Sequence, residues 1–217
     1  MENTFTEEFI IPRNWSKSSA MIKVIGVGGG GCNAVNHMYN SSIEGCSFAV
    51  CNTDTQVLEQ SPVPVKIQLG NDGLGAGTDP DRGRRCALES QKEIEEKILD
   101  DKTKMVFITA GMGGGTGTGA TPVIASAARQ KGILTVAVVT LPFKDEGNGS
   151  MSKALEGVHE LQRCVDSLLI INNEKIYDVY GDLMIQDAFP KTDEVLATAV
   201  KGIIEIITVP GYINVDF

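Results

Sequence analysis

A glycine-rich run, GGGTGTG at residues 113–119, follows directly on an apolar segment at 105–110. Six of the nine residues from 111 to 119 are glycine, and each costs about 0.5–1 kcal/mol of chain entropy relative to alanine. A tight turn needs only one or two glycines. We therefore interpret the run as a phosphate cradle, in which backbone N–H groups and the hydroxyls of Thr116 and Thr118 donate to phosphate oxygens.

A second glycine cluster, GVGGGGCN at residues 26–33, follows the apolar residues 22–25. It satisfies the GxGxxG pattern at Gly26, Gly28 and Gly31, which alone fits a dinucleotide site or a tight turn equally well. Neither cluster continues into the Gly-Lys-Ser/Thr of a Walker A loop. A nucleotide site here would therefore bind phosphates mainly through backbone amides and hydroxyls.

Composition excludes several functional classes. The 217 residues are 42% hydrophobic with a net charge of −9, so the bulk surface repels nucleic acid and anionic lipid. We expect no nucleic-acid partner. No apolar run approaches the roughly 20 residues that span a bilayer, so we expect no membrane insertion. The five cysteines form no CxxC pair, which predicts a reducing cytoplasmic location and no metal site of the protein's own.

Apolar, β-rich runs alternate with helical patterns along residues 21–217, and most of these runs are continuously apolar, as in strands buried on both faces of a parallel sheet. Strands are expected at 22–27, 48–52, 65–69, 105–110, 134–141 and 167–171. Helices are expected at 32–40, 81–99, 117–131, 150–164 and 192–208. The predicted fold is α/β, a doubly wound, mainly parallel sheet with helices on both faces, as in Rossmann-like nucleotide-binding domains. Residues 1–20 are expected to be a flexible or loosely docked arm.

The glycine clusters and several further motifs together resemble the tubulin/FtsZ family, and within it the bacterial cell-division GTPases. The run GGGTGTG looks like the tubulin signature, and IKVIGVGGGGCNAVNHM like the first nucleotide loop of those GTPases. The resemblance continues, in order, through CNTD (51–54), GLGAGTDP (73–80), LPF with EG (141–147), VDSLLIINNEK (165–175) and VPGYINVDF (209–217). It covers about residues 21–217.

The resemblance implies GTP or GDP as ligand, with Mg²⁺ bound through the nucleotide, and a role for each matching residue. Phosphate binding is implied for Gly29, Gly30, Gly31, Cys32, Asn33, Gly114, Gly115, Thr116, Gly117 and Thr118. Proximity to the nucleotide is implied for Asn52 and Asp54, and sensing of the γ-phosphate for Gly75, Ala76, Gly77 and Thr78. Ribose, base or guanine contacts are implied for Glu146, Asn173, Phe189 and Asp193.

Two of these roles also make sense from the residues alone. A carboxylate such as Asp193 can accept from guanine's N1–H and N2 amino groups together, an edge that adenine lacks. Stacking of a base on Phe189 would contribute about 1–3 kcal/mol. The competing interpretations are a core aromatic for Phe189 and a first-turn helix acid for Asp193, after a cap at Thr192.

The resemblance departs from the family pattern at Ser150, where the family has an arginine that reaches the nucleotide. Lys153 and Arg163 are possible substitutes, for which the sequence gives no geometric argument. The family hydrolyses GTP between subunits, with an acidic loop of one acting on the nucleotide of the next. Here Asn214 and Asp216 match that loop in trans, and its second aspartate is absent. We expect a nucleotide-binding half without the C-terminal activation domain, with little or no turnover.

The same resemblance implies self-association into protofilaments in the full-length protein, and contact with division-ring proteins through a C-terminal tail absent here. Three alternatives remain. The cluster at 26–31 could serve a dinucleotide-dependent oxidoreductase, although the second glycine run argues against it. The chain could also be another tubulin-superfamily GTPase, one for plasmid segregation, or a non-hydrolysing assembly module. Cys32 could be an activated thiol or simply a small residue that fills the turn.

Overall fold

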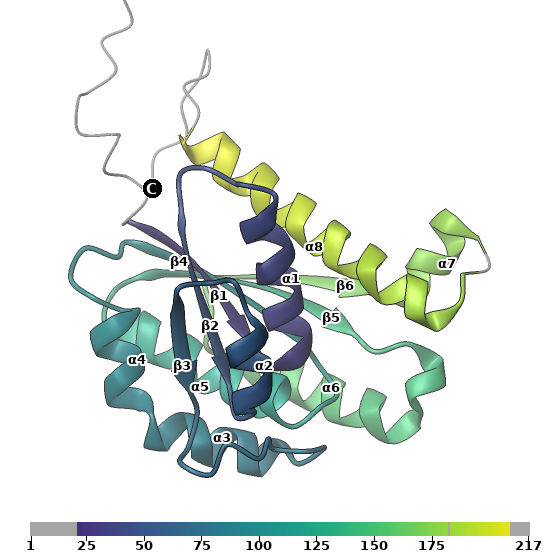
Figure 1. The fold of residues 1–217 in the computed structure, drawn as a ribbon, viewed down its shortest axis with the longest axis horizontal. Helices are drawn as coiled ribbons and strands as arrows, with labels where there is room; N and C mark the ends of the chain where they lie inside the picture. Colours follow the sequence, from purple (N-terminus) through teal and green to yellow (C-terminus); the bar gives the residue numbers. More distant parts are fainter. Residues whose placement is uncertain (1–20, 182, 209–217) are drawn as a thin grey trace, which may run out of the picture.

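The computed structural model describes residues 21–181 and 183–208 of the chain. Within them, six strands form one parallel sheet in the order β3-β2-β1-β4-β5-β6 (Figure 1). The strands are β1 (Ile22–Val27), β2 (Ser47–Asn52), β3 (Val65–Gln68), β4 (Met105–Gly111), β5 (Leu134–Leu141) and β6 (Ser167–Asn172). Every predicted strand is present, and the predicted doubly wound α/β fold is confirmed. The prediction succeeds because parallel strands covered on both faces must be continuously apolar.

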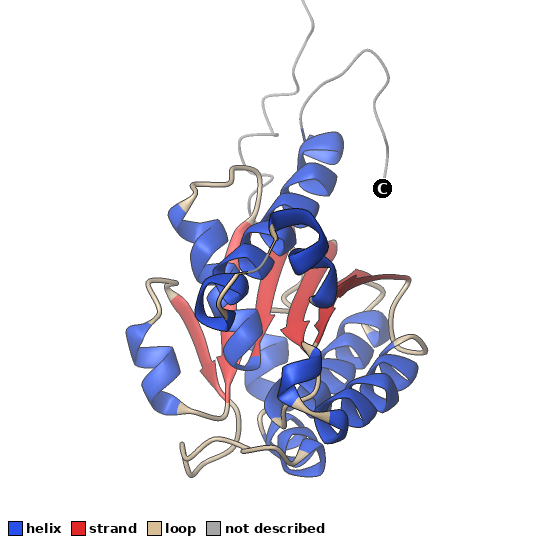
Figure 2. Cartoon of the chain, turned by 90° about the vertical axis from the view of Figure 1, so that its right-hand side faces the viewer, coloured by secondary structure: helices blue, strands red, loops and turns tan. Residues whose placement is uncertain are grey.

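Helices cover both faces of the sheet (Figure 2). They are α1 (Gly28–Asn40), α2 (Thr55–Gln60), α3 (Pro80–Glu89), α4 (Gln91–Lys97), α5 (Thr116–Gln130), α6 (Asn148–Leu161), α7 (Glu174–Tyr180) and α8 (Ile185–Thr208), with a 3₁₀ turn at Lys144–Glu146. One buried cluster joins the sheet to α3, α4, α5 and α6, and a second joins its other face to α1, α2 and α8. The sheet is thus the middle layer of three.

Alternation along β1 divides its side chains between these two layers. Ile22 and Val24 enter the cluster beneath α1 and α8, whereas Ile25 and Val27 enter the cluster beneath α5. Phe107 on β4 is also fully buried, on the α1 side. Because β1 and β4 lie side by side at the centre, the crossovers after them leave toward opposite edges of the sheet. Their carboxyl ends form the switch point at which such folds bind ligands.

Several predicted helix boundaries were wrong. Helix α1 begins at Gly28 rather than at residue 32, so its glycines form the first helical turn. The predicted helix at 81–99 is two helices that separate at Ser90, whose hydroxyl accepts from Gly70 N and donates to Gln68 O. The short helices α2 and α7 were not predicted. A hydroxyl that bonds to a neighbouring loop can thus stop a helix that pattern alone would continue.

Helix α8 begins at Ile185 and includes Pro190, whereas the sequence suggested a start at Thr192. The Thr192 hydroxyl donates to the Ala188 carbonyl four residues earlier, at 3.3 Å. The predicted cap at Thr192 was therefore wrong, since this side chain bonds back into a helix that has already begun. Asp193 therefore does not lie in the first turn of α8, and its interpretation as a first-turn helix acid was also wrong.

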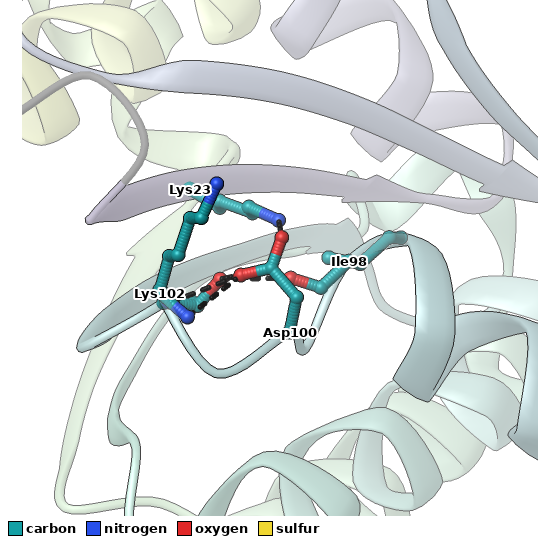
Figure 3. A network of polar contacts seen from close by, with 5 residues as sticks. Lys23, Ile98, Asp100 and Lys102 are labelled. Carbon is teal, nitrogen blue, oxygen red and sulfur yellow. Dashed lines mark hydrogen bonds and ion pairs between the residues drawn. The ribbon is translucent and has the colours of Figure 1, made fainter. Parts of the chain in front are cut away.

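The amino-terminal edge of the sheet is tied by one polar cluster, drawn in Figure 3. Lys23 on β1 reaches Asp100, in the loop between α4 and β4, with a separation of 3.0 Å between Nζ and Oδ2. The other Asp100 oxygen accepts from the amide of Lys102 at 3.1 Å. This cluster fixes the entry to β4 at the edge opposite the switch point.

Among the described residues, no helix combines the length and the apolar character that crossing a membrane requires.

Candidate functional site

A cavity of about 280 Å³ opens at the carboxyl ends of β1, β4 and β5, at the switch point of the sheet. Both glycine clusters contribute to its wall, and so do residues from α8. Its lining includes these residues predicted from the sequence: Gly29, Gly30, Gly77, Gly114, Gly115, Thr116, Gly117, Glu146, Asn173, Phe189 and Asp193. Segments that are 164 residues apart in the chain, from 29 to 193, thus meet around one cavity.

One end of the cavity is formed by the first turns of two helices. Neither α1 nor α5 has a side-chain cap or an acidic residue in its first turn. The first N–H groups of a helix have no acceptor within the helix, and its dipole is positive at that end. Two such helix starts at one cavity are a ready site for a phosphate group.

The glycines of this end fall into two groups. A Cβ on Gly31 would collide with the carbonyl oxygen of Thr109, and one on Gly28 would lie 2.7 Å from Gly117 N. These glycines are needed because α1 packs backbone to backbone against β4 and α5. Gly29 and Gly114 have no heavy atom within 4 Å of such a Cβ, yet both line the cavity. Their surfaces are open to a ligand.

The loop at residues 73–80 closes over the glycine run. Gly115 N donates to Gly77 O at 3.0 Å, and Gly75 N donates to Thr53 O at 3.0 Å. The Thr53 and Thr116 hydroxyls lie 2.6 Å apart and are buried. Gly75 and Gly77 have φ angles of 78° and 59°, which only glycine adopts readily. The loop is therefore held by its backbone on the wall of the cavity.

The other end of the cavity is built from side chains. Phe189 on α8 is 42% exposed and meets Phe143 edge to face, with 5.2 Å between ring centroids. Burial raises the pKa of the Asp193 carboxyl to about 7. Asn173 is buried, and its Oδ1 has no hydrogen-bond partner among the described residues. An aromatic face, a carboxyl and an unsatisfied amide oxygen at one cavity suit a planar base that carries N–H donors.

Glu146 also lines the cavity. Its Oε1 accepts from the amide of Phe143 at 2.8 Å, which fixes the carboxylate at the end of the 3₁₀ turn. The Ser150 hydroxyl donates to the carbonyl of Glu146 at 3.1 Å. A carboxylate held in this way retains acceptor capacity for hydroxyl groups such as those of a ribose.

The remaining predicted residues lie behind the wall or beside it. Thr118 accepts from Gly113 N at 2.8 Å, so its hydroxyl supports the glycine run. Asp54 caps α2 through Gln56 N and forms a bridge with Leu74. The others outside the lining are Gly31, Cys32, Asn33, Asn52, Gly75, Ala76 and Thr78. Asn214 and Asp216 lie outside the described residues, as does the predicted arm at 1–20.

Cys32 is fully buried, and its sulfur lies 3.8 Å from the carbonyl oxygen of Cys51 and 3.9 Å from Nδ2 of Asn52. Burial raises the pKa of its thiol to about 12. A thiol with so high a pKa is a poor nucleophile at neutral pH. Of the two interpretations of Cys32, the small residue that fills the turn is the one that fits.

Sequence reasoning missed part of the lining, namely Gly111, Met112, Thr140, Pro142, Thr192 and Leu196. Gly111 and Thr140 are register partners at the ends of β4 and β5. The signal that could have found them is position, because the last residues of central parallel strands face the switch point. Thr192 and Leu196 could not be found in this way, since their place depends on how α8 packs against α1 and β5.

In the part of the chain that the structure describes, no three His, Cys, Asp or Glu residues cluster as a metal site would require.

Comparison with known proteins decides between the candidate families. The family model for the tubulin/FtsZ GTPase domain matches residues 21–181. The chain belongs to the tubulin/FtsZ family. This assignment favours the predicted nucleotide site over the dinucleotide-dependent oxidoreductase.

Similar proteins agree with this assignment. The cell division protein FtsZ of Porphyromonas gingivalis is 51% identical over 97% of this chain, and that of Pseudomonas putida is 55% identical over 92%. An FtsZ structure from M. jannaschii, described as an empty dimer, has a TM-score of 0.87 at 45% identity and is matched over 93% of this chain. The chain spans 47% and 50% of the two division proteins and 59% of the M. jannaschii chain.

Proposed function

We propose that this chain is the guanine-nucleotide-binding part of a tubulin-like GTPase of bacterial cell division. One observation carries the proposal: two uncapped helix starts and the side chains of Phe189, Asn173 and Asp193 line the same cavity. The names of the similar proteins, which are cell division proteins, support the biological role.

The nucleotide would lie with its phosphates against α1 and α5 and its base against α8. First-turn amides and the Thr116 hydroxyl would donate to phosphate oxygens. Asp193, once ionised, would accept from guanine N1–H and N2, and a nucleotide N–H or O–H would satisfy the orphan Asn173 oxygen. Mg²⁺ bound with the nucleotide would offset phosphate charge. The chain's own contribution is to orient the phosphates and select the base.

Hydrolysis in the whole protein would occur between two copies, with the acidic loop of one copy positioning water at the γ-phosphate of the next. Asn214 and Asp216 belong to that loop in this proposal, and their role stays a prediction. We also propose that the whole protein assembles into protofilaments, lies in the cytoplasm and contacts division-ring proteins. The dimer described for the M. jannaschii protein supports self-association.

The proposal is tested by denaturing the purified chain and identifying the released nucleotide by chromatography and mass spectrometry, after incubation with an equimolar mixture of GDP, ADP and NAD and removal of free ligand. GDP should predominate. Recovery of NAD, or of GDP and ADP in equal amounts, would contradict it. Steady-state phosphate release from GTP should be slow for this chain, and turnover matching a full-length relative would overturn the expectation of hydrolysis between copies.

A further inference from the structure

The lining of the cavity has an imbalance of charge. It includes the acidic residues Glu146 and Asp193, and among the described residues it includes no lysine or arginine. A nucleoside di- or triphosphate carries several negative charges at neutral pH. Helix dipoles offset only about half a charge each. A cation close to the wall would therefore add directly to phosphate binding.

Lys153 on α6 is a cation that contacts the loop beside the cavity wall. Its Nζ donates to the carbonyl oxygen of Thr78 at 2.5 Å, across 75 residues of sequence. Thr78 follows Gly77, which lines the cavity and accepts from Gly115 N at 3.0 Å. The loop at 73–80 is thus held between two donors, the ammonium of Lys153 and the amide of the glycine run. An ammonium has three donors, so two remain for other acceptors.

The geometry of α6 brings Lys153 to the same side as Ser150. Residues three apart lie on one face of a helix, and the Ser150 carbonyl oxygen lies 3.0 Å from the position of a Cβ on Gly113. This face of α6 therefore packs on the glycine run. Arg163 lies beyond the end of α6, where it contacts His159 at 2.9 Å and its carbonyl accepts from Arg129 at 3.1 Å. The structure thus distinguishes Lys153 from Arg163 as a cation for the cleft.

We infer that Lys153 is the positioning cation of the phosphate end: it holds the loop at 73–80 through Thr78 and gives its remaining donors to the terminal phosphate. This inference rests on the proposed function. The contact with Thr78 ties the loop to α6, and the ammonium brings to the cleft the positive charge that its lining lacks. Terminal-phosphate recognition and loop position would then depend on one side chain.

The test compares Lys153→Met, Lys153→Gln and the wild-type chain, with Lys92→Met as a charge-matched control. Lys92 is an exposed lysine on α4, outside the cavity lining. Affinities for GMP, GDP and GTP are measured by calorimetry at low and high salt, and hydrogen exchange is followed at the amides of residues 75–79 without nucleotide. Glutamine can still donate to the Thr78 carbonyl but carries no charge, so it separates the two roles.

Lys153→Met should weaken GDP and GTP binding about tenfold or more, as expected for loss of a charge-assisted bond, and should change GMP binding less than twofold. It should also speed exchange at 75–79. Lys153→Gln should keep the slow exchange and lose the phosphate affinity, and the difference should shrink in high salt. Equal losses for GMP and GTP, or unchanged GTP affinity in Lys153→Met, would overturn the inference. A wild-type chain that binds no guanine nucleotide would instead overturn the proposed function.

Discussion

The phosphate end and the base end of the cleft are built from different parts of the chain. The phosphate end consists of backbone from the first turns of α1 and α5 and from the loop at 73–80, and its glycines pack on one another. The base end consists of the side chain of Asn173, which directly precedes α7, and of side chains on α8, which packs against α1 and β5. Backbone can recognise phosphates of any nucleotide, whereas side chains can choose among bases. We therefore expect changes at the phosphate end to alter the affinity for any nucleotide, and changes at the base end to alter the preference for guanine.

The largest effect is expected from Gly29→Asp at the phosphate end. A Cβ there meets no atom, and an acid in the first turn stabilises a helix by about 0.3–1 kcal/mol. The same charge would repel phosphate. Calorimetry should show GDP and GTP affinity reduced at least about a hundredfold, equivalent to about 2.7 kcal/mol, while the melting temperature is unchanged or raised. Gly31→Ala is the control in which stability should fall, because the clash of its Cβ with Thr109 O should cost about 1–3 kcal/mol of stability. Unaltered GDP affinity in Gly29→Asp would remove the phosphate assignment.

The next effect is expected from Asp193→Asn at the base end. An amide keeps the size of the carboxyl but cannot accept from guanine N1–H and N2 together. The ratio of GTP to ATP affinity should fall by about tenfold or more, the scale of one lost charge-assisted bond, with ATP affinity retained. Glu194→Gln, at the exposed neighbouring acid paired with Lys191, is the matched control. A ratio unchanged in Asp193→Asn would make Asp193 a structural residue of α8.

A third effect concerns pH. Burial raises the pKa of the Asp193 carboxyl to about 7. Guanine donors favour the ionised carboxyl, so binding lowers this pKa. GDP affinity should therefore level off above pH 7 and fall by up to about tenfold per unit below it. The free energy of unfolding without nucleotide should depend on pH in the opposite direction. The contribution of the neutral Asp193 carboxyl to stability is complete below about pH 4 and is lost as pH rises through 7. The pH dependence of GDP affinity is measured for wild type and for Asp193→Asn, so that protonation of the nucleotide itself cancels in the comparison. Parallel affinity curves for the two proteins would contradict a role for Asp193 in this pH dependence.

The smallest effect is expected from Ser150→Arg. The Ser150 backbone packs on Gly113 of the glycine run, and its hydroxyl only bonds to the Glu146 carbonyl. A guanidinium at this position would reach the phosphate end with added positive charge. GDP affinity should rise by about three- to tenfold, equivalent to about 0.7–1.4 kcal/mol. Ser152→Arg, exposed on the same helix, should raise it by less than twofold. Equal gains at both positions would indicate only a general change of net charge.

The difference between the two ends also shows in how much of the fold and of the cavity the sequence could predict. The strands were predictable because burial on both faces requires unbroken apolar runs. The glycine runs were recognisable because each glycine costs chain entropy on folding, so that many glycines together indicate a specific role. The start of α8 was not, since Pro190 and Thr192 look like a boundary and only the Thr192 bond to Ala188 shows otherwise. Thr140 could have been found from its place at the end of β5, whereas Leu196 joins the cavity through the packing of α8, which no local pattern encodes. Local rules thus described the strands and the glycine runs better than the start of α8 and the residues that α8 adds to the cavity.

The most direct test of the account is a calorimetric titration of the nucleotide-free wild-type chain with GDP, ADP and NADH under one set of conditions. The account predicts one site, with GDP bound at least about tenfold more tightly than ADP, a difference of about 1.4 kcal/mol, and with NADH binding no better than ADP. Equal affinity for GDP and ADP, or preferential binding of NADH, would contradict the claim that this cavity is a guanine-nucleotide site.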